Sequence, residues 1–89
     1  MKVRYSPGFI KILKKTDVRT RKHFKQQIIL FSQNPSNPLL HSHPLRDRWK
    51  GYRSINITSD WRAIYTKKVE GDEIVAYFVI LGTHKDLYE

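Results

Sequence analysis

The sequence predicts an α+β fold with a small, mostly antiparallel sheet in the order β-α-α-β-β-β and a helical hairpin packed on one face. Two amphipathic segments of helical period occupy the first half of the chain, and segments of strand character occupy the second. A cluster of Asn and Pro at residues 34–38 separates the halves. A length of 89 residues normally supports one hydrophobic core, so we expect a single domain over residues 1–89.

In the first half, Lys2–Tyr5 alternates in the manner of a short edge strand. Pro7 suits the first position of a helix, and apolar residues recur at helical spacing after it, which predicts a helix over Pro7–Lys15. Thr16 or Asp17 can cap a second helix that reaches about Ser32. These helices should form the antiparallel hairpin that covers the sheet.

In the second half, alternation and apolar content predict strands near Gly51–Ile57, Trp61–Lys67 and Glu73–Leu81. The last is nearly all apolar after its first residue, which favours a position inside the sheet. Gly71 can adopt positive φ in the turn before it. We expect Gly82-Thr83-His84 to end the strand and Lys85–Glu89 to form a short tail.

The charge of the chain points to a polyanionic partner. Seventeen Lys and Arg against eight Asp and Glu give a net charge of +9. Between Met1 and Leu40 there are nine Lys and Arg and one acid, Asp17. Such a field attracts nucleic acid or an acidic protein, and composition does not separate the two.

Other compositional features indicate a cytoplasmic protein. The absence of cysteine excludes disulfides, thiolate metal sites and a cysteine nucleophile. The first residues lack the apolar region of a signal peptide, and the longest apolar run, Ile74–Leu81, has eight residues. We therefore expect no membrane partner.

The stretch His43–Tyr65 concentrates residues suited to binding RNA. It holds both tryptophans, five of the Lys and Arg, and strand segments whose alternation places basic, aromatic and hydroxyl side chains beside apolar ones. Lys50 and Arg53 are candidates for contacts with a phosphate backbone, or else belong to a solvated face. Trp61 either stacks on a base or packs in the core.

Three residues at element edges are candidates for proton transfer. His43 precedes the first hairpin strand, Asp60 lies in its turn, and His84 follows the last strand. Two imidazoles and a carboxylate can perform general acid–base catalysis near neutral pH. The chain has no HExxH motif and no Gly-rich phosphate loop, so metal-dependent and nucleotide-driven reactions are disfavoured.

Five short motifs give the second half a family resemblance. They are His43-Pro44-Leu45, Trp49-Lys50-Gly51-Tyr52-Arg53, Asp60-Trp61, Ile64-Tyr65 and Gly82-Thr83-His84 with Leu87-Tyr88. Their order and spacing resemble those of the RelE/ParE superfamily of type II toxins, and most closely its YafQ-type (RelE/StbE) branch of mRNA interferases. The helical half agrees in layout only.

The resemblance implies a RelE-like toxin domain that acts as a ribosome-dependent mRNA endoribonuclease without metal or other cofactor. In this family the ribose 2′-OH attacks the adjacent phosphate and leaves a 2′,3′-cyclic phosphate. The implied partners are a cognate antitoxin protein and mRNA on the ribosome, with ribosomal RNA meeting the basic helical face.

The resemblance also implies roles for individual residues, according to their positions in the motifs. His43, Asp60 and His84 match the catalytic histidines and aspartate of YafQ-type toxins, with acid and base left unassigned. Arg62 matches an arginine of the RelE-type branch, which implies a role in stabilising the charge of the transition state or, alternatively, a cross-strand salt bridge. Tyr88 matches a C-terminal aromatic residue that either stacks on a base or holds the tail.

Two positions depart from the YafQ-type pattern. Asn56 replaces a further histidine, and Ile80 replaces an arginine that precedes Gly-Thr-His. Either Arg62 compensates for the lost cation, or the chain is a weakened member that only binds RNA or antitoxin. A third possibility is a ParE-like toxin that poisons DNA gyrase, against which the His43, Asp60 and His84 set argues.

Overall fold

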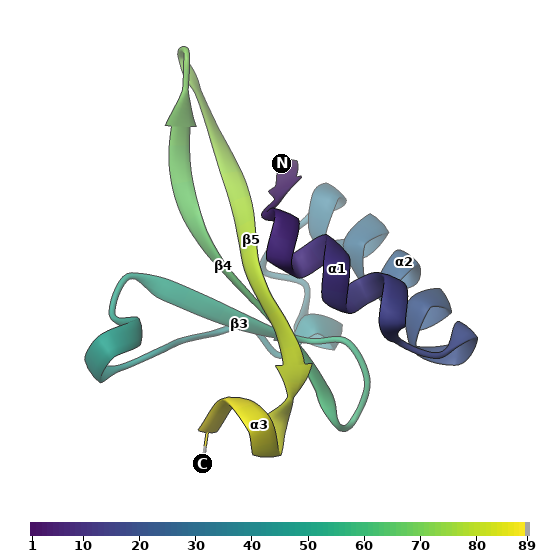
Figure 1. The fold of residues 1–89 in the computed structure, drawn as a ribbon. Coiled ribbons are helices and arrows are strands. Elements are labelled where there is room, and N and C mark those ends of the chain that lie inside the picture. The colour runs from purple at the N-terminus through teal and green to yellow at the C-terminus, as the bar shows by residue number, and fades with distance from the viewer. Residues whose placement is uncertain (89) are drawn as a thin grey trace.

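A computed structural model describes the backbone of residues 1–88 and the side chains of residues 1–87. A five-stranded sheet in the order β1-β5-β4-β3-β2 carries the helices α1 and α2 together on one face (Figure 1). β1 runs parallel to β5, and the remaining neighbours are antiparallel. The predicted α+β class and helical hairpin are confirmed.

The first half follows the sequence prediction closely. β1 (Lys2–Tyr5) is an edge strand, and the Ser6 hydroxyl accepts a hydrogen bond from the Phe9 amide at 3.0 Å, which caps α1 (Pro7–Lys15). α2 (Val18–Gln33) begins after Asp17, whose carboxylate accepts from the Thr20 amide at 2.7 Å. Asp17 rather than Thr16 is therefore the cap of this helix.

Aromatic side chains fill the space between the helices and the sheet. Phe78 of β5 lies at their centre, with its ring centroid 5.1–5.9 Å from four other rings, those of Tyr5, Phe9, Phe31 and Tyr65. Phe9, Phe31 and Phe78 are fully buried. Since each buried aromatic ring removes a large apolar area from water, this cluster is the main force that docks the helices.

β4 (Trp61–Glu70) and β5 (Glu73–Thr83) are longer than predicted and form a hairpin that projects beyond the other strands (Figure 1). Gly71 in its turn has φ +63°, as expected. β5 lies between β1 and β4, so the predicted interior position is confirmed.

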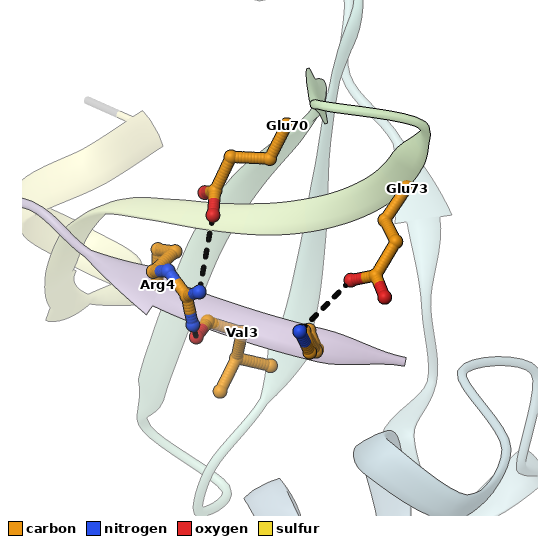
Figure 2. A network of polar contacts seen from close by, with 5 residues as sticks. Val3, Arg4, Glu70 and Glu73 are labelled. Carbon is orange, nitrogen blue, oxygen red and sulfur yellow. Dashed lines mark hydrogen bonds and ion pairs between the residues drawn. The ribbon is translucent and has the colours of Figure 1, made fainter.

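Two exposed ion pairs connect the projecting hairpin to β1. Lys2 lies 2.9 Å from Glu73, and Arg4 lies 3.0 Å from Glu70 (Figure 2). Because all four side chains are about half exposed, each pair contributes about 0–1 kcal/mol and fixes register more than stability.

A β-bulge in β5 decides which side chains enter the core. Ile64 pairs with Ile80 and Tyr65 pairs with Phe78, so Val79 is the extra residue. The bulge allows Phe78 and Leu81 to share the helix-covered face, although strict alternation would place them on opposite faces. Ile80 consequently lies on the face without α1 and α2, which we call the open face.

The connector between α2 and β3 (Tyr52–Asn56) contains structure that the sequence did not predict. Two short 3-10 turns, η1 (Pro38–Leu40) and η2 (Asp47–Trp49), flank a two-residue strand, β2 (His43–Pro44). β2 pairs with Ser54 and Arg53 at the edge of β3. Two residues are too few to produce a recognisable alternation, and Pro44 is tolerated because β2 is an edge strand.

The predicted end of the last strand is wrong, and so is the predicted tail as far as Tyr88; Glu89 lies outside the described residues. β5 continues through Thr83, and α3 (His84–Tyr88) replaces the tail. The Thr83 hydroxyl accepts a hydrogen bond from the Asp86 amide at 3.2 Å and so caps this short helix. Within the described residues, no helix is long and apolar enough to cross a membrane.

The cap of α2 gives the fold a testable dependence on pH. The hydrogen bond from the Thr20 amide lowers the pKa of Asp17 below its ordinary value. The ionised Asp17 carboxylate therefore contributes to the free energy of unfolding at pH values above its pKa in the unfolded chain, about 3.9. This contribution is lost as the pH falls through the lower pKa of Asp17 in the folded protein. We expect the Tm advantage of wild type over Asp17→Asn, which keeps a neutral cap, to shrink in acid. An advantage that stays constant in thermal melts between neutral and acidic pH would contradict this account.

Candidate active site

Asp60 and His84 lie opposite each other where the β4–β5 ladder ends. Trp61 pairs with Thr83, and the backbone N–H of His84 donates to the carbonyl oxygen of Asp60 at 2.8 Å, which adds one further rung. Both residues are exposed. Two predicted catalytic residues, 24 positions apart in the sequence, are thus brought together by strand pairing.

The turn between β3 and β4 holds Asp60 in place. The Thr58 hydroxyl accepts hydrogen bonds from the amides of Asp60 at 3.2 Å and Trp61 at 3.0 Å. The Ile57 amide donates to the Trp61 carbonyl at 2.9 Å and closes the turn. These bonds order the backbone that presents the Asp60 carboxylate.

Arg62 also stabilises this turn. Its Nη1 donates to the carbonyls of Thr58 at 2.9 Å and Trp61 at 3.1 Å, and its Nη2 donates to the Ser59 carbonyl at 3.1 Å. A guanidinium has five N–H donors, so two remain for another acceptor. Neither ion pair of the described residues involves Arg62, so the alternative of a cross-strand salt bridge is not observed there.

His43 lies on the open face at the edge of the sheet. It pairs with Ser54, which pairs with Ile64, which pairs with Ile80, so these residues form one row across four strands. His43 is exposed, and its Nδ1 lies 3.3 Å from the Pro44 carbonyl oxygen. By strand order β3 and β4 separate it from β5, so the ladder does not place it directly beside His84.

The two departures from the YafQ-type pattern also lie on the open face. Asn56 pairs with Arg62, and Arg62 pairs with Gly82. The position at which the resemblance expects a histidine therefore stands directly across from an arginine. Ile80 is half-buried beside Ile64 and supplies no charge.

Gly82 allows α3 to pack where it does. A Cβ at this position would lie 3.1 Å from Cδ2 and 3.2 Å from Cγ of Leu87. Leu87 therefore rests directly on the backbone of β5, and α3, which begins at His84, is held against the sheet. The Gly-Thr-His motif thus has a packing reason for its glycine and a capping reason for its threonine.

Arg53 lies on the opposite face of the sheet from His43, and Lys50 lies in a turn outside the strands. Arg53 pairs with Tyr65, on the face that the helices cover, and its Nε donates to the Ser42 hydroxyl at 3.1 Å. Beyond the ends of the helices, Arg53 borders a surface hollow with His41 and Lys67. Lys50 is exposed in the turn that follows η2.

Trp61 is both a core residue and a surface residue. It is half-buried and packs against the core cluster, so the core alternative is confirmed. It also lines a hollow with Asp60, Arg19 and His23. The sequence alone does not single out Arg19 as part of a site; its spacing of four residues from His23 on one helix is the only signal available.

The remaining site prediction lies outside the described residues. The backbone of Tyr88 belongs to α3, but its side chain is not described, so its proposed stacking stays a prediction. Among the described side chains, no group of three or more His, Asp or Glu is arranged to hold a metal ion.

Comparisons with known proteins agree on one family. The model of the family described as "Bacterial toxin of type II toxin-antitoxin system, YafQ" matches residues 1–89. No curated protein matches the sequence.

Solved structures add the following similarities. YafQ from Escherichia coli is 28% identical, with 99% of this chain and 98% of that chain covered at a TM-score of 0.76. The E. coli DinJ–YafQ complex matches at 28% identity, 99% and 98% coverage and a TM-score of 0.65. A YoeB/ParE toxin from Agrobacterium tumefaciens, at 23% identity, 94% and 99% coverage and a TM-score of 0.76, shares the fold.

The contact between Gly82 and Leu87 predicts a measurable coupling. Gly82→Ala should lower the free energy of unfolding by about 1 kcal/mol, because the new methyl group crowds Leu87. Leu87→Ala in the same chain should remove most of that added cost. A double-mutant cycle from urea unfolding measures the coupling, and additive effects of the two substitutions would show that Leu87 does not rest on Gly82.

Proposed function

Because the chain belongs to the YafQ family of bacterial toxins from type II toxin–antitoxin systems, we propose that it is a ribosome-dependent mRNA endoribonuclease. The observation that carries the proposal is the pairing of Asp60 with His84 at the end of the β4–β5 ladder. An exposed carboxylate and an exposed imidazole at the adjoining ends of two neighbouring strands are suited to moving two protons around one phosphate.

The reaction requires one base and one acid. The base removes the proton of the ribose 2′-OH, and the 2′-oxygen then forms a bond to the adjacent phosphorus. The bond from phosphorus to the 5′-oxygen breaks, and the acid protonates that oxygen. The products are a 2′,3′-cyclic phosphate and a 5′-hydroxyl. Asp60, His43 and His84 supply the groups, with His84 and Asp60 closest to each other in the ladder.

Arg62 is the proposed source of positive charge for the phosphorane. Three of its donors hold the Thr58–Ser59 turn, and two remain free to meet phosphate oxygens. Its position across from Asn56 supports the view that Arg62 compensates for the absent histidine and for the arginine that Ile80 replaces. The turn contacts would also keep the guanidinium preorganised, which reduces the cost of orienting it.

The other predicted RNA contacts fall on different surfaces. Lys50 is exposed near the edge of the sheet, and Arg53 borders a hollow on the helix side. Trp61 and Tyr88 come from the two elements that flank the Asp60–His84 pair. We propose that the RNA passes the Asp60–His84 end of the sheet and that Lys50 and Arg53 contact its backbone farther away.

The basic helical face is the proposed contact with ribosomal RNA. α1 and α2 carry seven basic residues, and within residues 1–87 none of these side chains forms an ion pair with a carboxylate. They are Lys11, Lys14, Lys15, Arg19, Arg21, Lys22 and Lys25. When several such side chains of one helical layer bind RNA phosphates, they displace the counterions condensed on the RNA, and this release favours binding.

A cognate antitoxin and a cytoplasmic location complete the proposal. The similar E. coli protein has been solved as a DinJ–YafQ complex, which supports an antitoxin partner for this chain. A partner of this kind would counter the charge of +9 and mask the catalytic surface.

The test of catalysis compares wild type with conservative variants of each proton carrier. We expect induced wild type to arrest growth and to create new mRNA ends, mapped by primer extension. Asp60→Asn, His84→Gln and His43→Gln should each reduce cleavage on the order of 10²–10⁴-fold while Tm is retained. Matched controls are Asp72→Asn, in the exposed hairpin turn, and His41→Asn, which keeps a residue tolerant of the φ of 48° at that position.

Other outcomes point to other functions. Growth arrest without mRNA cleavage would contradict the proposal and favour a gyrase-directed toxin. No arrest from soluble, folded wild type would mean that Asn56 and Ile80 have removed the chemistry and that the chain only binds.

Arg62 should contribute to both catalysis and stability. Arg62→Ala should reduce cleavage on the order of 10²-fold, because a preorganised donor to the transition state is lost, and should lower Tm, because three turn carbonyls lose their donor. Arg62→Lys should recover part of the rate but less of the Tm, since an ammonium cannot span the turn. Lys68→Ala on the projecting hairpin is the charge-matched control. Unchanged cleavage with a reduced Tm would restrict Arg62 to a structural role.

A further inference from the structure

A hollow lies between the first turns of α2 and the turn that joins β3 to β4. Arg19 and His23 line it from the helix, and Thr58, Ser59, Asp60 and Trp61 line it from the turn and the start of β4. Asp60 therefore belongs both to this hollow and to the pair with His84. Whatever occupies the hollow lies directly beside the proposed catalytic groups.

The helix side of the hollow is suited to a phosphate. Arg19 and His23 are four residues apart on α2, so their side chains share one face of the helix. Arg19 is exposed, and His23 is half-buried. The nearest carboxylate along the chain, Asp17, already accepts a hydrogen bond from the Thr20 amide at 2.7 Å. A guanidinium beside an imidazole is a good receptor for a phosphate oxygen.

The sheet side of the hollow is suited to a nucleobase. Trp61 is held by its packing on the core and by the hydrogen bond from its amide to Thr58. An aromatic ring that is held in place and partly exposed can stack on any nucleobase. The hydroxyls of Thr58 and Ser59 and the carboxylate of Asp60 can accept hydrogen bonds from base amines. Because stacking on an aromatic ring and hydrogen bonds from base amines are typical of nucleotide binding, the combination favours RNA over an acidic protein segment.

We propose that this hollow binds the nucleotide adjacent to the bond that is cut, with its base against Trp61 and its phosphate on Arg19 and His23. The inference rests on the proposed endoribonuclease activity and adds a binding subsite to it. In this proposal Arg19 and His23 position the substrate, whereas the other basic residues of α1 and α2 contribute to the positive electrostatic field of the helical face.

The test measures binding without cleavage. The probe is a short 2′-O-methyl RNA oligonucleotide, which lacks the attacking hydroxyl. Trp49→Phe leaves Trp61 as the only tryptophan, so its fluorescence reports stacking directly. This readout is preferable to truncation of Trp61, because Trp61 packs on the core. We expect the oligonucleotide to quench Trp61 fluorescence in a saturable manner.

Variants in that background separate the subsite from the general charge. Arg19→Ala should raise the Kd for quenching on the order of tenfold, since a charge-assisted hydrogen bond to phosphate is lost. His23→Gln should weaken binding less. Lys25→Ala removes the same charge from the same helix, but six residues from Arg19 and on a different face, and should change the Kd by less than about threefold.

Each remaining outcome decides the question. Equal effects of Arg19→Ala and Lys25→Ala would overturn the subsite, because only the general field would then matter. Absence of quenching in a wild-type chain that cuts mRNA in cells would also overturn it and leave the proposed function intact. Quenching that depends on Arg19 in a chain that cuts no mRNA would support the subsite and reject the endoribonuclease. Quenching by an acidic peptide but not by RNA would overturn it and assign the hollow to a protein partner.

Discussion

The antiparallel pairing of β4 with β5 is the interaction on which the rest of the structure depends. At the middle of this ladder, Tyr65 faces Phe78 and begins the aromatic cluster that holds both helices. At one end the ladder extends into the projecting hairpin that is ion-paired to β1. At the other end it places Asp60 opposite His84. Core, edge and candidate active site thus share a single register, and a slip of one residue would disturb all three.

The bulge at Val79 separates the roles of the two faces. Without it, Phe78 and Leu81 could not both face the helices, and Ile80 could not line up with Ile64 on the open face. The helix-covered face therefore provides stability, while the open face carries His43, Asn56 and Arg62. This division explains why candidate catalytic residues and packing residues alternate within a few positions of one strand.

The candidate site combines rigid support with exposed chemistry. Thr58 and Arg62 fix the turn that carries Asp60, and Thr83 and Gly82 fix the start of the helix that carries His84. Each supporting contact is a hydrogen bond to the backbone or a close packing contact, and Asp60 and His84 are both exposed to solvent. Such preorganisation is what transition-state stabilisation requires.

The sequence by itself determined the α+β class, both helices, the three strands of the second half and the family motifs, because each depends on local spacing. It also identified His43, Asp60 and His84 as residues at element edges. Tertiary structure alone decided that Asp60 and His84 meet while His43 stays at the far edge, that Arg53 lies on the helix side, and that Arg19 and His23 adjoin Trp61. Strand order, the bulge and helix docking are long-range contacts, and no local pattern encodes which distant segments will pair.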